Sequence, residues 1–304
     1  MQQSYEVIII GGSYAGLSAA MSLGRSLRRV LIIDGGNPCN HPAPVTHNFI
    51  THDGDDPATV AKSALEQVLA YDTVDYVQDT ATKSAGKDGD FTVTTANNLP
   101  YRATKLLFAT GLQDNLPDIP DVDACWGKTV IHCPYCHGYE FRGQPTGVLM
   151  NSDHTVSMVQ LIRNLSNDVT LFTNGPAVAD KSRLQECGVR LIEQPIERLL
   201  HEDGELRSVC LRDGTEVAVS ALYLHPILTQ KCPLPEAMGC ELEDNGTLKV
   251  DDFMMTSVTG IYAAGDCTTH MRAVSFATGS GTLVGGMINH ALVMERFRAT
   301  HVGG

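Results

Sequence analysis

The sequence predicts an α/β fold built from two domains, and three observations predict it. A strand, a glycine turn and a helix follow one another over residues 7–23. A similar strand and helix begin near Gly147, and a strand at 260–264 leads through Gly265-Asp266 into a long helix. Strands that alternate with helices in this way are typical of parallel sheets covered by helices. We therefore expect two Rossmann-like, three-layer domains of the nucleotide-binding type.

The elements of the N-terminal region follow from apolar runs, which indicate strands, and from apolar residues at helical spacing. They are strands at 7–10, 30–33 and 105–109 and helices at 17–23 and 57–69. Asp56-Pro57 begins the second helix, because aspartate caps a helix N-terminus and proline suits its first turn. Thr110-Gly111 ends the third strand.

Pro117 and Pro120 mark the crossing into a second domain. Its expected elements are strands at 146–150, 169–172 and 189–192 and helices at 154–164 and 182–187. Asp213-Gly214 and Asn245-Gly246 are each expected to be a turn between two short strands. The strand after Asn245-Gly246 is expected at 247–250. The closing helix, from about Ala273 to Arg298, follows the strand at 260–264. We expect one discontinuous domain, 1–116 with 244–304, and a central domain, 117–243.

Acidic residues outnumber basic ones, 35 to 22, which gives a formal net charge of −13. This charge disfavours nucleic acid as a partner and favours a protein with a basic face. No apolar run approaches the ~18 residues that cross a bilayer, and the first residues lack the pattern of a signal peptide. We expect a cytoplasmic protein that binds neither nucleic acid nor a membrane.

Nine cysteines are scattered along the chain, and an odd number in a cytosolic-looking sequence argues against a disulfide framework. Seven of them are expected to be reduced, buried and apolar in character: Cys39, Cys125, Cys187, Cys210, Cys232, Cys240 and Cys267.

The other two cysteines form the run Cys133-Pro134-Tyr135-Cys136-His137-Gly138. Two thiols at this spacing can close a small disulfide and so store two electrons. The same spacing is half of a zinc site, but no second Cys-x-x-Cys and no spaced histidine pair accompanies it. The sequence therefore favours a redox dithiol and predicts no metal site.

The turn Gly11-Gly12-Ser13-Tyr14-Ala15-Gly16 predicts a dinucleotide site, because it joins a strand to a helix and presents backbone N–H groups to phosphate. Asp34 ends the next strand, where a carboxylate can accept hydrogen bonds from ribose hydroxyls. Ser13 stands at the middle glycine of the G-x-G-x-x-G pattern and adds a small side chain there. These residues do not distinguish FAD from NAD.

The C-terminal segment carries a family resemblance. Gly246-Thr247-Leu248-Lys249-Val250-Asp251, Thr256-Ser257 and Gly260-Ile261-Tyr262-Ala263-Ala264-Gly265-Asp266 resemble the second flavin motif of the thioredoxin reductase family. Together with Ala109-Thr110-Gly111 and the Cys-x-x-Cys run, the resemblance covers almost the whole chain. It implies FAD as the cofactor and a homodimer as the assembly. It also implies that Asp266 holds the ribityl chain and that the start of the last helix points at the flavin, with contacts from Arg272, Ala273 and Val274.

The same resemblance implies that Cys136 faces the flavin and that Cys133 exchanges with the substrate. The family usually has aspartate after the second cysteine, whereas this chain has His137, which could take and return a thiol proton. His132, directly before the dithiol, is a second candidate base. The Cys-x-x-Cys-His-Gly run also resembles the dithiol oxidases of gliotoxin-type and holomycin-type metabolites, which pass electrons from a dithiol through flavin to oxygen.

The central domain departs from the family where NADPH would bind. Met150-Asn151-Ser152-Asp153-His154 replaces the glycine loop, and its side chains would obstruct a pyrophosphate. Thr173-Asn174-Gly175 offers no cation to a 2′-phosphate, which would lose charge-assisted hydrogen bonds of roughly 1.5–3 kcal/mol each. NADPH use is therefore doubtful, unless Arg163, Lys181 or Arg183 bind it in an unfamiliar way.

We expect an FAD-dependent thiol–disulfide oxidoreductase that resembles thioredoxin reductase and works through Cys133, Cys136 and His137. Its partner is a thioredoxin-like protein or a small dithiol or disulfide. Two alternatives stay open: an O2-dependent dithiol oxidase that forms a disulfide in a small molecule or peptide, and a non-catalytic flavin redox sensor. The direction of electron flow, and the choice among NADPH, ferredoxin and O2 as electron partner, also stay open.

Overall fold

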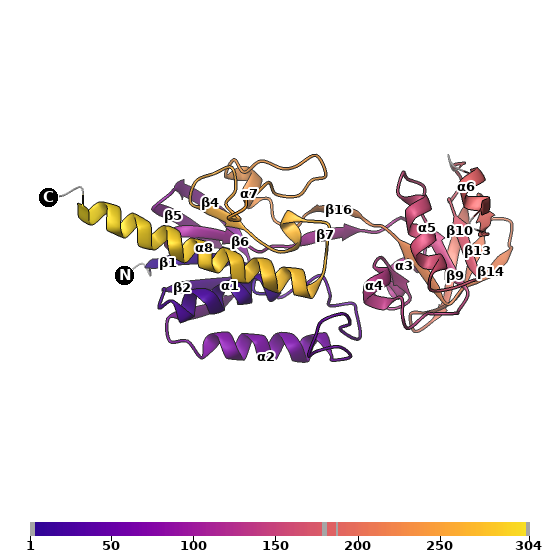
Figure 1. The fold of residues 1–304 in the computed structure, drawn as a ribbon, viewed down its shortest axis with the longest axis horizontal. Coiled ribbons are helices and arrows are strands. Elements are labelled where there is room, and N and C mark those ends of the chain that lie inside the picture. The colour runs from indigo at the N-terminus through magenta and orange to yellow at the C-terminus, as the bar shows by residue number, and fades with distance from the viewer. Residues whose placement is uncertain (1–3, 178–180, 187, 302–304) are drawn as a thin grey trace. The chain divides into compact units, whose positions relative to one another are not determined.

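The computed structural model describes residues 4–177, 181–186 and 188–301. It is a mixed α/β protein with parallel sheets, which confirms the expected fold class (Figure 1). Its contacts divide the chain into two compact units. Unit 1 contains Met1–Cys39, Ala58–Gln113 and Leu228–Gly304, and unit 2 contains Asn40–Pro57 and Asp114–Ile227.

Three segments group differently from the expected domains. Residues 228–243 group with unit 1, and residues 40–57 and 114–116 group with unit 2. In the second segment Pro42 lies against Gly127, where an added Cβ would come within 2.7 Å of the Pro42 Cβ. This segment has no apolar periodicity, so the sequence offers no sign of the unit to which it belongs.

The sheet of unit 1 has the strand order β3-β2-β1-β6-β5-β4, with β17 also paired to β6. Its strands are β1 (Ser4–Ile10), β2 (Val30–Asp34), β3 (Val74–Gln78), β4 (Ala81–Lys87), β5 (Asp90–Thr95), β6 (Pro100–Phe108) and β17 (Ile261–Ala263). β4, β5 and β6 form an antiparallel meander, and the other pairs are parallel. The parallel strands read as nearly continuous apolar runs because helices or loops cover both of their faces.

The register of the parallel strands determines where their loops meet. Ile10 of β1 lies opposite Ile33 of β2 and Phe108 of β6, and Phe108 lies opposite Ala263 of β17. The carboxyl ends of these four strands are therefore level. The segments that follow them, which contain the expected dinucleotide-binding residues, leave from the same edge of the sheet.

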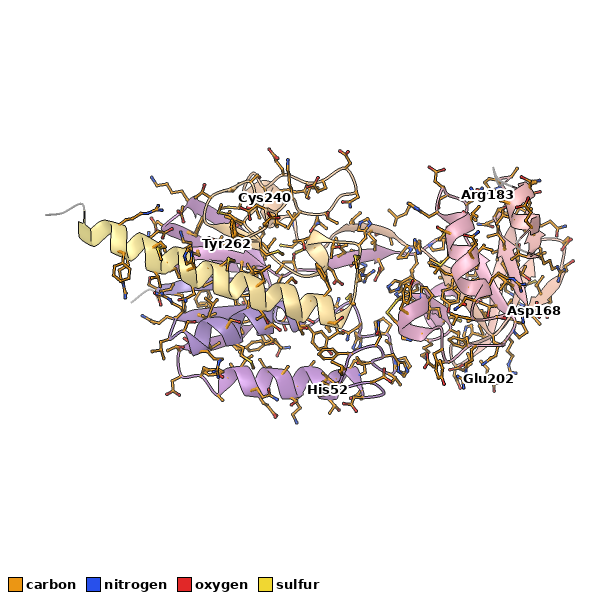
Figure 2. All side chains as sticks on the ribbon, in the orientation of Figure 1. His52, Asp168, Arg183, Glu202, Cys240 and Tyr262 are labelled. Carbon is orange, nitrogen blue, oxygen red and sulfur yellow. A yellow bond between two sulfur atoms is a disulfide. The ribbon has the colours of Figure 1, made fainter. Side chains whose placement is uncertain are left out.

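The helices of unit 1 include two that pack closely, as Figure 1 shows for α1 and the long α8. Helical elements in or entering this unit are α1 (Tyr14–Arg25), α2 (Pro57–Leu69), α7 (Leu234–Ala237), η1 (Asp266–Thr268) and α8 (Val274–His301). An added Cβ at Gly281 would lie 2.2 Å from the Ala15 carbonyl oxygen, and one at Gly285 would lie 2.8 Å from the Ala19 oxygen. Backbone therefore meets backbone along this contact. Tyr262 of β17 is buried in the same core, beside α8 (Figure 2).

Unit 2 has a parallel sheet of order β11-β10-β9-β15-β8 and an antiparallel sheet of order β12-β13-β14. Its strands are β8 (Val130–Ile131), β9 (Thr146–Leu149), β10 (Val169–Phe172), β11 (Arg190–Ile192), β12 (Ile196–Glu202), β13 (Glu205–Leu211), β14 (Glu216–Ala218) and β15 (Ala221–Leu224). Its helices are α3 (Val122–Cys125), α4 (Pro134–His137), α5 (Thr155–Arg163) and α6 (Lys181–Glu186). β7 (Leu112–Asn115) and β16 (Ile227–Gln230) pair with each other.

Some expected elements change in the structure. Residues 247–250 were expected to be a strand, but they make only isolated bridges, such as Leu242 to Leu248. The expected helix at 182–187 is α6, and Cys187 lies outside the described residues. Over the described ranges, no helix has both the length and the apolar character needed to cross a membrane.

Candidate functional site

The glycine turn between β1 and α1 requires its glycines. Gly11 has φ +110°, and an added Cβ there would lie 2.2 Å from the Ala109 oxygen. At Gly16 an added Cβ would lie 1.9 Å from the Gly11 oxygen. A side chain at either position would collide with backbone, which cannot rotate away as a side chain can. The turn thus brings the β1 end, the β6 end and the first turn of α1 together.

The first turn of α1 is suited to an anion. Ser13 is the N-cap residue with extended backbone, but its side chain makes no capping hydrogen bond. No acidic residue occupies the first turn. The positive end of the helix is therefore not neutralised by its own side chains, which suits a pyrophosphate.

Asp34 lies beside this turn. The Gly12 N–H donates to Asp34 Oδ1 at 3.1 Å, and the Tyr76 hydroxyl donates to Asp34 Oδ2 at 3.1 Å. Burial and the neighbouring Asp34 carboxylate raise the pKa of Tyr76 to about 12, so Tyr76 stays a neutral donor. Tyr76 belongs to β3 and is separated from Asp34 in the chain by α2, so no local sequence pattern indicated it.

The end of β6 adds a polar atom that the protein leaves unpaired. Thr110 Oγ1 is buried and has no hydrogen-bond partner in the described part of the chain. A buried hydroxyl without a partner is costly, so a polar ligand atom at this place would stabilise it. Gly111, next to it, has φ +67°, a conformation that glycine adopts without strain.

Asp266 stands at the end of β17, where an added Cβ on Gly265 would lie 2.8 Å from the Ala15 Cβ. Arg272 Nε donates to Asp266 Oδ2 at 3.3 Å, and both side chains are largely buried. The Ser280 hydroxyl accepts the Gly265 N–H at 3.1 Å. Ser280, on α8, is a second residue that the sequence analysis missed.

These residues fit a dinucleotide cofactor. The turn, Asp34, Thr110-Gly111 and Asp266 all leave the same edge of one parallel sheet, and the last helix begins at Val274, directly after Ala273. The set offers helix-terminal N–H groups, a carboxylate beside the turn and an unpaired buried hydroxyl. Phosphate, ribose and ring atoms need donors and acceptors of these kinds.

Cys133 and Cys136 form a disulfide, with their Cα atoms 5.3 Å apart. Cys133 is the N-cap residue of the short helix α4, and Pro134 occupies its first position. The Cys136 N–H donates to Cys133 Sγ at 3.1 Å. An N–H group directed at sulfur favours the thiolate form once the disulfide is reduced.

His137 is the last residue of α4. Burial lowers its pKa most, the neighbouring His47 lowers the pKa further, and Glu140 raises it. The two imidazole rings lie edge to face, 6.3 Å between centroids. His132 instead stacks on Trp126, 5.7 Å between ring centroids. His137 therefore lies in a group of titratable side chains, whereas His132 packs against an aromatic ring.

Of the other cysteines, Cys125, Cys240 and Cys267 are buried as expected, and Cys210 and Cys232 are half-buried. Complete burial raises the pKa of the Cys267 thiol to about 12. Cys39 was expected to be buried, but it is exposed. It lies in the loop after β2 and its thiol faces the Asp266 carboxylate at 3.5 Å. No cluster of three or more metal-ligating side chains is found among the described residues.

The segment after β9, where a nicotinamide nucleotide would need open backbone, is filled by its own side chains. Thr155 Oγ1 accepts the Ser152 N–H at 2.9 Å, and Ser152 Oγ accepts the His154 N–H at 3.3 Å. After β10, Asn174 Oδ1 accepts the Ile196 N–H at 2.8 Å. Side-chain oxygens thus take up the backbone N–H groups of Ser152 and His154, directly before α5.

The cations considered for NADPH lie in unit 2. Lys181 pairs with Glu193 at 2.8 Å, and Arg163 donates to the carbonyl oxygens of Ser166 and Asn167. Arg183 is on α6 (Figure 2).

Comparisons with known proteins agree with this arrangement. Residues 5–281 match the family model described as pyridine nucleotide-disulphide oxidoreductase. The chain is 30% identical over 295 residues to the thioredoxin reductase aclD of Aspergillus oryzae, covering 92% of this chain and 93% of that one. The crystal structure of HlmI superposes with a TM-score of 0.94 at 34% identity, covering 99% and 96% of the two chains.

A putative thioredoxin reductase TrxB from Bacillus anthracis has a TM-score of 0.92 at 32% identity, covering 96% of this chain and 99% of that one. The matched family binds FAD in general, and its thioredoxin-reductase-like members are enzymes. The chain belongs to the pyridine nucleotide-disulphide oxidoreductase family, and within it is a thioredoxin-reductase-like, flavin-dependent disulfide oxidoreductase.

Proposed function

We propose that this enzyme binds FAD in unit 1 and exchanges two electrons between the flavin and a dithiol through Cys133 and Cys136. The bound flavin would supply the two-electron acceptor. The residues proposed to hold FAD are Gly11, Gly12, Ser13, Ala15, Gly16, Asp34, Thr110, Gly111, Gly265, Asp266, Arg272, Ala273 and Val274. The level ends of their strands and the unpaired Thr110 hydroxyl support this assignment.

In the proposed chemistry, Cys133 exchanges with the substrate and Cys136 passes electrons to the flavin. The N–H of Cys136 on Cys133 Sγ supports Cys133 as a stabilised leaving thiolate. His137 would accept the thiol proton. A lowered pKa supports this role, because a neutral imidazole is the form that accepts a proton.

The direction that we favour is dithiol oxidation, with O2 as the final electron acceptor. The segment after β9 supports this choice. The side-chain oxygens of Ser152 and Thr155 accept hydrogen bonds from backbone N–H groups that a pyrophosphate would need as donors. The substrate is a small dithiol or the dithiol of a thioredoxin-like protein. The second candidate is a disulfide reductase with NADPH or ferredoxin as donor, which is favoured by relatives that are named thioredoxin reductases.

An anaerobic titration tests the direction of electron flow. We expect dithiothreitol to bleach the flavin absorbance completely by two dithiols per flavin, because the disulfide and the flavin each take two electrons, whereas NADPH leaves the absorbance unchanged. Admitting air should restore the absorbance and produce hydrogen peroxide over many turnovers. Stoichiometric bleaching by NADPH would instead support the reductase, and a single bleaching without turnover would support a redox sensor.

We also propose that the enzyme is a homodimer. The large apolar side chains that are substantially exposed on α8 include Phe276, Leu283 and Met294. Their spacings of seven and eleven residues place them on one face of the helix, and a second copy of this chain would bury that face. We expect Leu283→Arg to convert the dimer into a monomer in sedimentation velocity, and an unchanged sedimentation coefficient would argue against this interface. The cytoplasmic location stays a prediction.

A further inference from the structure

The segment 40–57 brings a third titratable group to the dithiol helix. His47, which follows β2 in sequence, belongs to unit 2 with the dithiol. Its ring lies edge-on to His137 at 6.3 Å. Its Nε2 lies 3.5 Å from Glu140 Oε1, and its Nδ1 lies 3.4 Å from Asp53 Oδ1. His47 therefore lies beside both His137, the proposed base, and Glu140, an acid three residues after His137.

Two carboxylates lie beside the His47 ring. Nδ1 faces Asp53 and Nε2 faces Glu140, and a protonated ring would present an N–H group to each of them. The Asn48 N–H also donates to Asp53 Oδ1 at 2.8 Å, which holds that carboxylate in place. The His47 side chain is 22% exposed, so solvent only partly screens its charge from His137.

We propose that His47 is a positioning residue of the dithiol centre, and that it keeps His137 in the neutral form that accepts a thiol proton. This inference rests on the proposed function, because it assigns a task to His137. When protonated, the His47 ring beside His137 makes a second positive charge there unfavourable, whereas Glu140 favours one. The two neighbours thus act on His137 in opposite directions, and their balance determines the pH range of thiol exchange.

A substrate thiol gives its proton to His137, and its thiolate sulfur bonds to Cys133 Sγ. The Cys133–Cys136 bond breaks, and Cys136 becomes a thiolate. The second substrate thiol then displaces Cys133 and loses its proton to the Cys133 thiolate, which completes the substrate disulfide. Two electrons now reside on the cysteine pair, and a bound FAD would supply their acceptor. A protonated His137 could not begin this sequence.

Three other titratable side chains bear on the pH dependence of the His47–His137 pair. They are Asp53 on the same segment as His47, Glu140 after α4, and Tyr223 of β15, which interacts with Glu140. Burial and the Glu140 charge raise the pKa of Tyr223 far above neutrality, so Tyr223 is uncharged near neutral pH. Of these three side chains, Asp53 and Glu140 therefore supply the negative charge beside the two rings in the oxidised enzyme.

The test compares His47→Gln with Glu140→Gln by NMR titration of the His137 ring in the oxidised enzyme with FAD bound. Removal of the His47 charge should raise the His137 titration midpoint by about half a pH unit, and removal of the Glu140 charge should lower it by a similar amount. The acid limb of anaerobic flavin reduction by dithiothreitol should move in the same two directions. His137→Gln identifies the ring signal by its loss.

His52→Gln is the matched control. His52 lies on the same segment and also pairs with an aspartate, Asp55, at 2.8 Å (Figure 2). We expect it to leave the His137 midpoint unchanged. Midpoints that stay fixed in both His47→Gln and Glu140→Gln, or that move in one common direction, would overturn the proposal. The NMR measurement needs no turnover, so it decides the role of His47 even if dithiols fail to reduce the flavin and the proposed function fails.

Discussion

Replacing Cys136 with serine is expected to abolish flavin reduction by dithiols while FAD stays bound. A hydroxyl cannot form the disulfide that the structure contains, and it does not ionise to a nucleophile near neutral pH, so electrons lose their route to the flavin. We expect a loss of at least about 1,000-fold in the reduction rate, the scale seen when a covalent catalytic group is removed. Anaerobic stopped-flow absorbance measures the rate, and the visible spectrum reports bound FAD.

Cys210→Ser is a suitable control for this substitution. Cys210 is a half-buried thiol of unit 2 on β13, with its thiol directed at the Leu211 carbonyl, and its loss should leave the rate within about twofold. The only tryptophan of the chain, Trp126, stacks on His132 beside Cys133, so its fluorescence reports the dithiol state without the flavin. Undiminished flavin reduction in the Cys136→Ser enzyme would refute its assignment.

The elements and site residues that the sequence predicted correctly are those with a signal in the neighbouring residues. The turn at Gly11–Gly16, the end of β2 at Asp34 and the start of α8 near Ala273 each carry a signal within a few residues, because backbone geometry and helix termini restrict the amino acids there. The disulfide between Cys133 and Cys136 also follows from a short spacing. In each case the neighbours that decide the structure are near in the chain.

Residues that meet only through tertiary contacts escaped prediction. His47 comes from a segment without periodicity, and nothing in its neighbours indicates that it meets His137. Tyr76 joins Asp34 through strand pairing, and Ser280 joins Gly265 through helix packing. The prediction of a strand at 247–250 was wrong for a related reason. These residues follow a turn, as a hairpin strand would, but they form isolated bridges rather than a strand. Long-range contact, rather than residue type, decided each of these positions.

Two glycines of α8 should respond to alanine with opposite signs. An added Cβ at Gly281 would lie 2.2 Å from the Ala15 carbonyl oxygen, so α8 and α1 must move apart. We expect Gly281→Ala to lower the free energy of unfolding by about 1–3 kcal/mol, as overpacking does. It should also weaken FAD binding at least about tenfold, because Ala15 belongs to the glycine turn and lies against Gly265. Denaturant unfolding and flavin fluorescence titration measure the two effects.

Gly279→Ala provides the comparison within the same helix. An added Cβ at Gly279 meets nothing within 4 Å, so this substitution should only gain helix propensity, about 0.5–1 kcal/mol of added stability. Since both variants carry the same chemical change, a difference in sign isolates the contact between α8 and α1. Stabilisation by Gly281→Ala, or equal FAD affinity in the two variants, would contradict a backbone contact that holds the glycine turn in place.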